Sequence, residues 1–234
     1  MEAASVMPDL APALPEIILA IGAMALLMFG VFRKDDDAGP VAMGAIALFI
    51  ITGAAIVMAP SETATTFGFS FIADPFARFV KILILVGAGA TLLMGISSMR
   101  ADNLNRFEYP VLLVLATLGM FMMVSANGLI ALYIGIELQS LALYVVAAFK
   151  RDSLRSSEAG LKYFVLGALS SGMLLYGASL IYGFAGTVSY VGLGTALSDG
   201  ASMGVVVGLV FFMAGMAFKI SAVPFHMWTP DVYE

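Results

Sequence analysis

Long apolar runs, separated by short polar loops, make up most of the chain. A helix that crosses a bilayer needs about 20 mostly apolar residues, and several runs reach or approach that length. The predicted spans are residues 15–32, 40–59, 74–98, 107–125, 129–149, 156–182 and 201–224. Between the second and third spans, a Thr- and Phe-rich connection over residues 60–71 is expected to form a short extended hairpin. The pattern therefore predicts an all-α polytopic membrane protein with about seven transmembrane helices.

The composition indicates a membrane protein and excludes several kinds of site that need cysteine. The 234 residues are 61% hydrophobic and 12% charged, with a mean hydropathy of +1.01, whereas a soluble domain is roughly 45–50% apolar and 25% charged. The sequence has no cysteine and a single histidine. It therefore excludes disulfides, thiolate metal sites and iron–sulfur ligation by this chain, and we expect no redox centre or metal site in it.

The basic residues predict the orientation of the spans. Most Lys and Arg residues fall in the loops after the first, third and fifth spans, whereas the N-terminal segment and the other connections have none. The loop residues are Arg33, Lys34, Arg100, Arg106, Lys150, Arg151 and Arg155. Since cytoplasmic loops are rich in Lys and Arg, the N-terminus is predicted to lie outside and the residues after the seventh span inside.

The third span is expected to begin at Asp74-Pro75, because an aspartate N-cap followed by proline at the first helical position is a typical helix start. Arg78 and Lys81 follow within the first two turns. We interpret both as interfacial charges that extend toward the aqueous phase or pair with the cap.

Glu137 lies near the middle of the fifth span, where a charged group is costly and usually faces a protein interior or an aqueous pathway. Tyr133, Ser140 and Tyr144 share its helix face, which predicts a polar stripe that points away from lipid. The favoured interpretation is a functional intramembrane acid. The alternative is a protonated carboxyl that only links helices through a hydrogen bond.

Two lysines complete the set of charges within the later spans. Lys162 lies about one and a half turns into the sixth span, four residues after Glu158, so an interfacial ion pair with that residue is the alternative to a functional role.

Lys219 precedes Pro224, which cannot donate to the carbonyl of Ile220. The seventh span is therefore expected to be broken beside Lys219, where freed carbonyls could face the ammonium group. The alternative is a lysine at an ordinary helix end. We predict that Glu137, Lys162 and Lys219 belong to one ion-transfer path.

Small residues recur at four-residue spacing in the sixth span, as Gly167 with Ser171 and Ala168 with Gly172. Such pairs let membrane helices approach closely. They are expected to bring the sixth span against the fifth.

Several blocks of the sequence resemble a known family, subunit N of NADH-quinone oxidoreductase, or respiratory complex I. The resemblance runs from about residue 74 to the end. The blocks are Glu137-Leu138-Gln139-Ser140, Glu158-Ala159-Gly160-Leu161-Lys162-Tyr163-Phe164, Phe218-Lys219-Ile220-Ser221 and Val223-Pro224-Phe225-His226.

This resemblance implies an antiporter-like fold of 14 helices with two inverted repeats, of which this chain would be the N-terminal half. Residues 1–106 would hold the three leading helices, and residues 107–234 spans four to seven, most of the first repeat. Protons would pass through Glu137, Lys162 and Lys219, with His226 as a possible relay beside the broken helix. A change in the pairing between Glu137 and Lys219 would switch the lysine between holding and releasing its proton.

The resemblance also implies an enzyme subunit without a redox centre of its own. The complex would use NADH, FMN, iron–sulfur clusters and quinone. The partners would be neighbouring antiporter-like subunits of the membrane arm and the lipid bilayer, with no nucleic acid, in the bacterial inner membrane rather than the mitochondrial one. Two alternatives are a large subunit of a multisubunit cation/proton antiporter and a membrane scaffold whose charges only pair helices.

Overall fold

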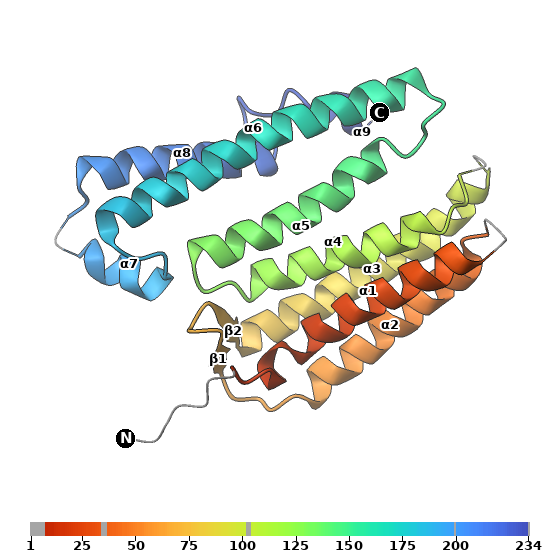
Figure 1. Cartoon of the computed structure of the whole chain (residues 1–234), viewed down its shortest axis with the longest axis horizontal. Coiled ribbons are helices and arrows are strands. Elements are labelled where there is room, and N and C mark those ends of the chain that lie inside the picture. Colours follow the sequence, from red (N-terminus) through yellow and green to blue (C-terminus); the bar gives the residue numbers. More distant parts are fainter. Residues whose placement is uncertain (1–7, 34–36, 102–103, 199, 234) are drawn as a thin grey trace. The chain divides into compact units, whose positions relative to one another are not determined.

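The computed structural model describes residues 8–33, 37–101, 104–198 and 200–233 (Figure 1). The chain forms two compact units, Met1–Asn127 and Gly128–Glu234, and each is described by itself. Of the basic loop residues used above to predict orientation, Lys34 lies outside the described residues.

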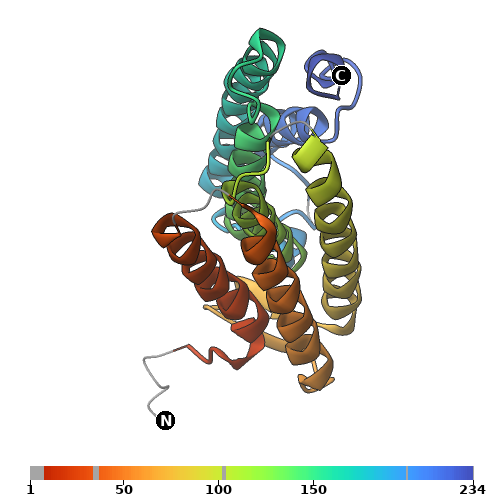
Figure 2. The same ribbon diagram turned by 90° about the vertical axis from the view of Figure 1, so that its right-hand side faces the viewer.

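The first unit is a group of four long helices with a small hairpin at one end. Its elements are η1 (Ala11–Ala13), α1 (Leu14–Phe32), α2 (Gly39–Met58), β1 (Ala64–Thr66), β2 (Phe71–Ala73), α3 (Pro75–Ala101) and α4 (Glu108–Val124). Helices α1 and α2 lie side by side in both views (Figure 1, Figure 2). Leu19, Leu92 and Phe121 are fully buried between the helices.

The predicted extended hairpin is confirmed. Strands β1 and β2 pair antiparallel, with Thr65 opposite Ile72. The Ile72 N–H donates to the Ser125 carbonyl at 2.9 Å, so β2 is also tied to the end of α4. The predicted start of α3 is confirmed as well, because Asp74 Oδ1 accepts the Ala77 N–H at 2.6 Å.

The two basic residues at the start of α3 differ in their exposure and in their partners. Arg78 donates to the Glu62 carbonyl at 3.2 Å, on the exposed end of the unit. Lys81 is only 3% exposed and pairs with Glu16 of α1. The prediction that Lys81 extends toward the aqueous phase or pairs with the cap is therefore wrong, because a partner from a distant span holds the ammonium inside the unit.

The second unit contains the last spans. Its helices are α5 (Leu129–Ala147), α6 (Leu154–Ala185), α7 (Tyr190–Ala196), α8 (Met203–Lys219) and α9 (Thr229–Tyr233). Helix α6 packs on α5 and, over a longer contact, on α8. The short helix α7 falls in a region expected to be a loop, since a helix of this length with two glycines has little helical signal.

Glycines permit the close approach of α6 and α8. A Cβ atom at Gly177 would overlap the backbone of Gly208 and Phe212, and a Cβ atom at Gly215 would press on Leu174. Small residues at a helix interface allow backbones to approach in this way.

The long helices differ in whether they reach the length of a membrane span. Within the described residues, α1, α2, α3, α5 and α6 are long and apolar enough to cross a membrane, whereas α4 and α8 are apolar but shorter. The protein is an all-α polytopic membrane protein, and the count of seven spans with an outer N-terminus stays a prediction. The last long helix ends at Lys219, where the sequence predicted a break.

Candidate functional site

The side chain of Lys219, the last residue of α8, is surrounded by polar groups of α5. Its Nζ donates to Ser140 Oγ at 2.8 Å and to Tyr144 OH at 3.2 Å. It also lies 3.3 Å from Glu137 Oε1, and the Lys219 and Glu137 side chains are only 11% and 21% exposed. An ammonium group has three N–H donors, so these three partners match its full donor capacity.

The local sequence explains this geometry. Glu137, Ser140 and Tyr144 are spaced by three and four residues, so they share one face of α5. Helix α8 ends before Pro224, which cannot continue it, and Ser221 adopts a left-handed φ of 55° just after the last turn. The partners of the ammonium are side chains, and not the freed backbone carbonyls that the sequence had suggested.

Helix α6 supplies a further partner for the carboxylate. Ser171 Oγ donates to Glu137 Oε1 at 2.5 Å, and Ser171 is buried. The same carboxylate oxygen therefore receives the Ser171 hydroxyl and faces the Lys219 ammonium. Hydrogen bonds to a charged acceptor are stronger than neutral ones, so this contact helps to hold the Glu137 side chain beside Lys219.

An aromatic cluster holds the chain beyond the helix break. It consists of Tyr144, Tyr163, Phe218 and Trp228, all buried. The rings of Tyr163 and Tyr144 contact each other edge-on, with their centroids 4.5 Å apart. The ring centroids of Phe218 and Trp228 are 5.4 Å apart. The cluster thus links α5, α6 and α8 to the segment that follows Lys219. It fixes the ring whose hydroxyl binds the ammonium.

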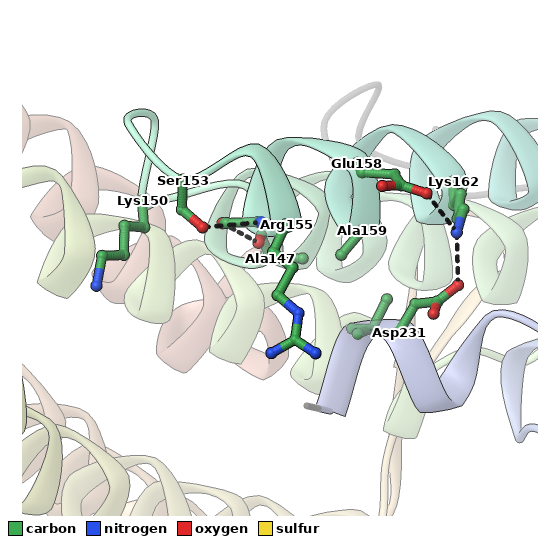
Figure 3. A pocket seen from close by; sticks show the side chains of 10 residues that line it. Ala147, Lys150, Ser153, Arg155, Glu158, Ala159, Lys162 and Asp231 are labelled. Atoms are coloured by element: carbon green, nitrogen blue, oxygen red, sulfur yellow. Dashed lines mark hydrogen bonds and ion pairs between the residues drawn. The ribbon is translucent and has the colours of Figure 1, made fainter.

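Lys162 belongs to a second, more exposed cluster. Its Nζ lies 2.8 Å from Glu158 on the same helix and 3.0 Å from Asp231 on α9 (Figure 3). The Lys162 side chain is 44% exposed and borders a hollow of about 440 Å³ that Lys150 and Arg155 also line. The ion pair with Glu158 is the one that the alternative interpretation expected.

His226 lies in the non-helical segment between α8 and α9, where it is exposed. Its backbone carbonyl accepts the Thr229 N–H at 3.0 Å. Of the four residues proposed from the sequence, the structure thus brings Glu137 and Lys219 together and leaves Lys162 and His226 outside that contact.

Sequence reasoning missed two parts of this site. Ser171 was interpreted only as a small packing residue, although a serine facing the predicted acid stripe was a possible signal. Trp228 was not predicted as part of the site, because its buried position depends on how the chain folds back after the break.

The chemistry available here is proton transfer and charge pairing. The buried part contains one carboxylate, one ammonium and hydroxyl groups that can both accept and donate. In the part of the chain that the structure describes, no group of three or more His, Asp and Glu residues could hold a metal ion.

Fold and site together define an all-α membrane protein with an intramembrane pair of acid and lysine. Residues 126–234 match the family described as NADH:quinone oxidoreductase/Mrp antiporter, TM. Over these residues the chain is similar to the membrane domain that this family describes, as the sequence blocks had indicated.

Relatives in bacteria support this assignment. The chain is 63% identical to NADH-quinone oxidoreductase subunit N of Parvibaculum lavamentivorans, over 99% of this chain and 48% of the relative. It is 57% identical to subunit N 1 of Rhizobium meliloti, over 100% of this chain and 49% of the relative. The chain therefore spans about half the length of the curated relatives it matches.

Solved structures have the same fold. A chain of respiratory complex I from Thermus thermophilus with bound aureothin matches with a TM-score of 0.77 and 30% identity, over 94% of this chain and 47% of that chain. The archaeal membrane-bound sulfane sulfur reductase matches with a TM-score of 0.82 and 21% identity, over 96% and 48%, and supports the fold alone.

Proposed function

We propose that this chain is part of a membrane subunit of an NADH-quinone oxidoreductase and translocates protons through buried Glu and Lys residues. The observation that carries the proposal is the contact between Lys219 and Glu137 among apolar helices, at 3.3 Å. Intramembrane ionisable residues are costly and commonly mark proton relays. The names of the relatives described above fit this function, although the chain spans only about half their length.

In this mechanism, Lys219 is the residue that holds and releases a proton. Glu137 stabilises the charged ammonium, and Ser140 and Tyr144 accept two of its N–H groups. Removing one member of a buried ion pair leaves the other charge uncompensated, which is strongly unfavourable. When the Glu137 charge is neutralised or drawn away, Lys219 therefore loses its proton. A hydroxyl group that accepts this proton can then release its own proton to the next acceptor.

Lys162 and His226 would extend this path toward the aqueous phase. Lys162 borders the open hollow beside the basic residues Lys150 and Arg155, on the side predicted to be inside (Figure 3). We assign it the role of exchanging protons with that side. His226, exposed beside the helix break, is proposed as a relay.

The remaining roles concern the whole subunit and its complex. Residues 1–106 would form the three leading helices, and residues 107–234 most of the first of two inverted repeats. NADH, FMN, iron–sulfur clusters and quinone would be bound by other subunits. The neighbours would be other antiporter-like subunits of the membrane arm, in the bacterial inner membrane.

The test is Lys219→Ala in the complete subunit, with proton pumping driven by NADH oxidation in inverted membrane vesicles. Assembly of the complex is measured in parallel. Arg106→Ala, a change at an exposed loop residue, is the control. An assembled Lys219→Ala complex should lose most of its pumping and coupled turnover, while the control retains both. Normal pumping by the assembled variant would show that Lys219 is only a helix-end residue.

A further inference from the structure

A second buried ion pair lies in the first unit, away from the site described above. Lys81 of α3 and Glu16 of α1 approach to 2.5 Å, and their side chains are 3% and 8% exposed. Both residues lie within the first turns of apolar helices, beneath the β1–β2 hairpin. A charged pair inside a membrane protein usually has a function beyond holding helices together.

The environment satisfies the ammonium better than the carboxylate. Lys81 Nζ lies 5.1 Å from the ring centroid of Phe71 and 5.6 Å from that of Phe121, distances at which aromatic faces attract a cation. Glu16 Oε2 is buried and receives no hydrogen bond from any described residue. A buried carboxylate oxygen without a partner is costly, so water is expected at this atom.

A cavity leads from the end of the unit to Lys81, one member of the pair. Its volume is about 270 Å³, and Lys81 is part of its lining, together with Arg78 and the exposed residues Asp9 and Glu62. A water molecule occupies about 30 Å³ in the liquid, so the cavity has room for several. Solvent can therefore reach the ammonium side of a pair that is otherwise enclosed.

Among the described residues of this unit, few other charged groups lie near the pair. Asp9 and Glu62 lie at the cavity rim, and Arg78 lies one turn before Lys81 on α3. Helix α2 contains no titratable side chain, and the titratable residues of α4, Glu108 and Tyr109, lie at the opposite end of that helix from Phe121. The protonation of the pair is thus governed mainly by its two members and by solvent.

We propose that Glu16 and Lys81 form a proton-exchange site that is in contact with the aqueous phase through this cavity. In the exchange, an N–H bond of Lys81 breaks and an O–H bond forms at Glu16, so that the charged pair becomes a neutral amine and a neutral acid. The Lys81 amine, which lines the cavity, then takes a proton from a hydronium ion there, and the carboxylic acid of Glu16 holds the exchanged proton until the step reverses. This proposal does not rest on the role of Lys219.

The alternative is a permanently charged pair that only fastens α1 to α3. Such pairs are often replaceable by apolar residues without loss of stability, so stability measurements alone cannot separate the two roles. The protonation state of Glu16 does separate them, because a fixed ion pair contains no carboxylic acid.

A hydrophobic carbodiimide tests this directly, since it reacts with protonated carboxyl groups and leaves a stable N-acylurea adduct. Membranes that contain the assembled complex with the complete subunit are treated over a series of pH values, and adducts are located by peptide mass spectrometry. Glu62, at the rim of the same cavity, reports whether the reagent reaches it. We expect Glu16 to be labelled, with a several-fold rise in the labelled fraction from alkaline to acidic pH.

The Lys81→Gln variant removes the counter-charge and should keep Glu16 protonated and labelled even at alkaline pH. Labelling of Glu62 without labelling of wild-type Glu16 at any pH would overturn the proposal. It would also be overturned if Lys81→Gln left the pH dependence of Glu16 labelling unchanged. The wild-type measurement decides the question even if the variant does not assemble.

Discussion

The indole ring of Trp228 lies flat on the ring of Tyr163, with centroids 4.4 Å apart and an interplanar angle of 12°. Trp228 follows the break after α8, and Tyr163 belongs to α6. Tyr163 in turn contacts Tyr144, whose hydroxyl accepts a hydrogen bond from Lys219. The stacking therefore joins the chain beyond the break to the ring that helps to bind the ammonium group.

Trp228→Ala should release this segment and loosen Tyr144. Truncation of a buried Trp to Ala typically costs about 3–5 kcal/mol. We expect a lower unfolding temperature of the subunit and a reduced ratio of pumped protons to oxidised NADH in the variant that still assembles. Met227→Ala, at an exposed neighbour, is the control and should change neither quantity. Equal behaviour of the two variants would contradict the anchoring role.

Ser171→Ala should weaken proton transfer without a large loss of structure. It removes the hydroxyl that donates to Glu137, and hydrogen bonds to charged groups contribute about 1.5–3 kcal/mol. We expect slower pumping relative to NADH oxidation in inverted vesicles.

The matched control is Ser170→Ala. Ser170 is also buried on α6, but its hydroxyl donates to the Gly215 carbonyl at 3.1 Å. This change should affect thermal stability by about 1 kcal/mol and leave the coupling ratio as in the wild type. Reduced coupling in Ser170→Ala and not in Ser171→Ala would refute the assignment.

Gly167→Ala should displace the Tyr144 ring. A Cβ atom at Gly167 would overlap the Tyr144 hydroxyl, which therefore has to move from its place beside Lys219. Overpacking of this kind costs typically about 1–3 kcal/mol. The expected result is a lower pumping rate, measured with assembly checked in parallel.

Gly172→Ala tests whether any added methyl group on α6 has the same effect. This position has open space within 4 Å of a Cβ atom. The variant should pump normally and be as stable as the wild type, because alanine favours a helix over glycine. If both glycine variants lost activity to the same extent, the contact with Tyr144 would not be the cause.

Glu158→Gln and Asp231→Asn should each leave the unfolding temperature nearly unchanged. The ion pairs of these residues with Lys162 are exposed and screened by solvent, and such pairs contribute little to stability. Lys162→Ala, in contrast, should reduce pumping if this lysine exchanges protons with the hollow beside it. Thermal unfolding and vesicle pumping of the three variants distinguish these effects, and a large stability loss in Glu158→Gln would show that the pair is structural.

Most of the helical layout could be predicted from the sequence, because apolar run length is a strong signal. A polar stripe on one helix face and a proline after the lysine each marked one member of the Glu137–Lys219 pair, whereas the pairing itself was implied only by the family resemblance. The end of α8 at Lys219 agrees with the predicted break beside this residue, whereas the side-chain partners of the ammonium depend on tertiary packing and did not follow from the sequence.

The contact between Glu16 and Lys81 could not be predicted from the spacing of apolar and polar residues along the chain. Each residue alone looks like a charge near a helix end, for which contact with the aqueous phase is the ordinary outcome. Their contact depends on how α1 and α3 are brought together by α2 and α4, which each pack on both helices, a relation between residues far apart in the sequence. Ser171 was missed for the same reason, because its partner lies on another helix.

The length of α6 has a consequence for its two ends. A helix of 32 residues is about 48 Å long, at about 1.5 Å per residue, whereas the hydrocarbon layer is only about 30 Å thick. Such hydrophobic mismatch is relieved by tilting or by projection of one end into the headgroup region. Projection of the first turns would place Lys162 and its acidic partners among water and lipid headgroups, while Ser171 stays at the depth of the acyl chains. One continuous helix would thus carry its exposed ion pairs and its buried hydroxyl in two different solvents.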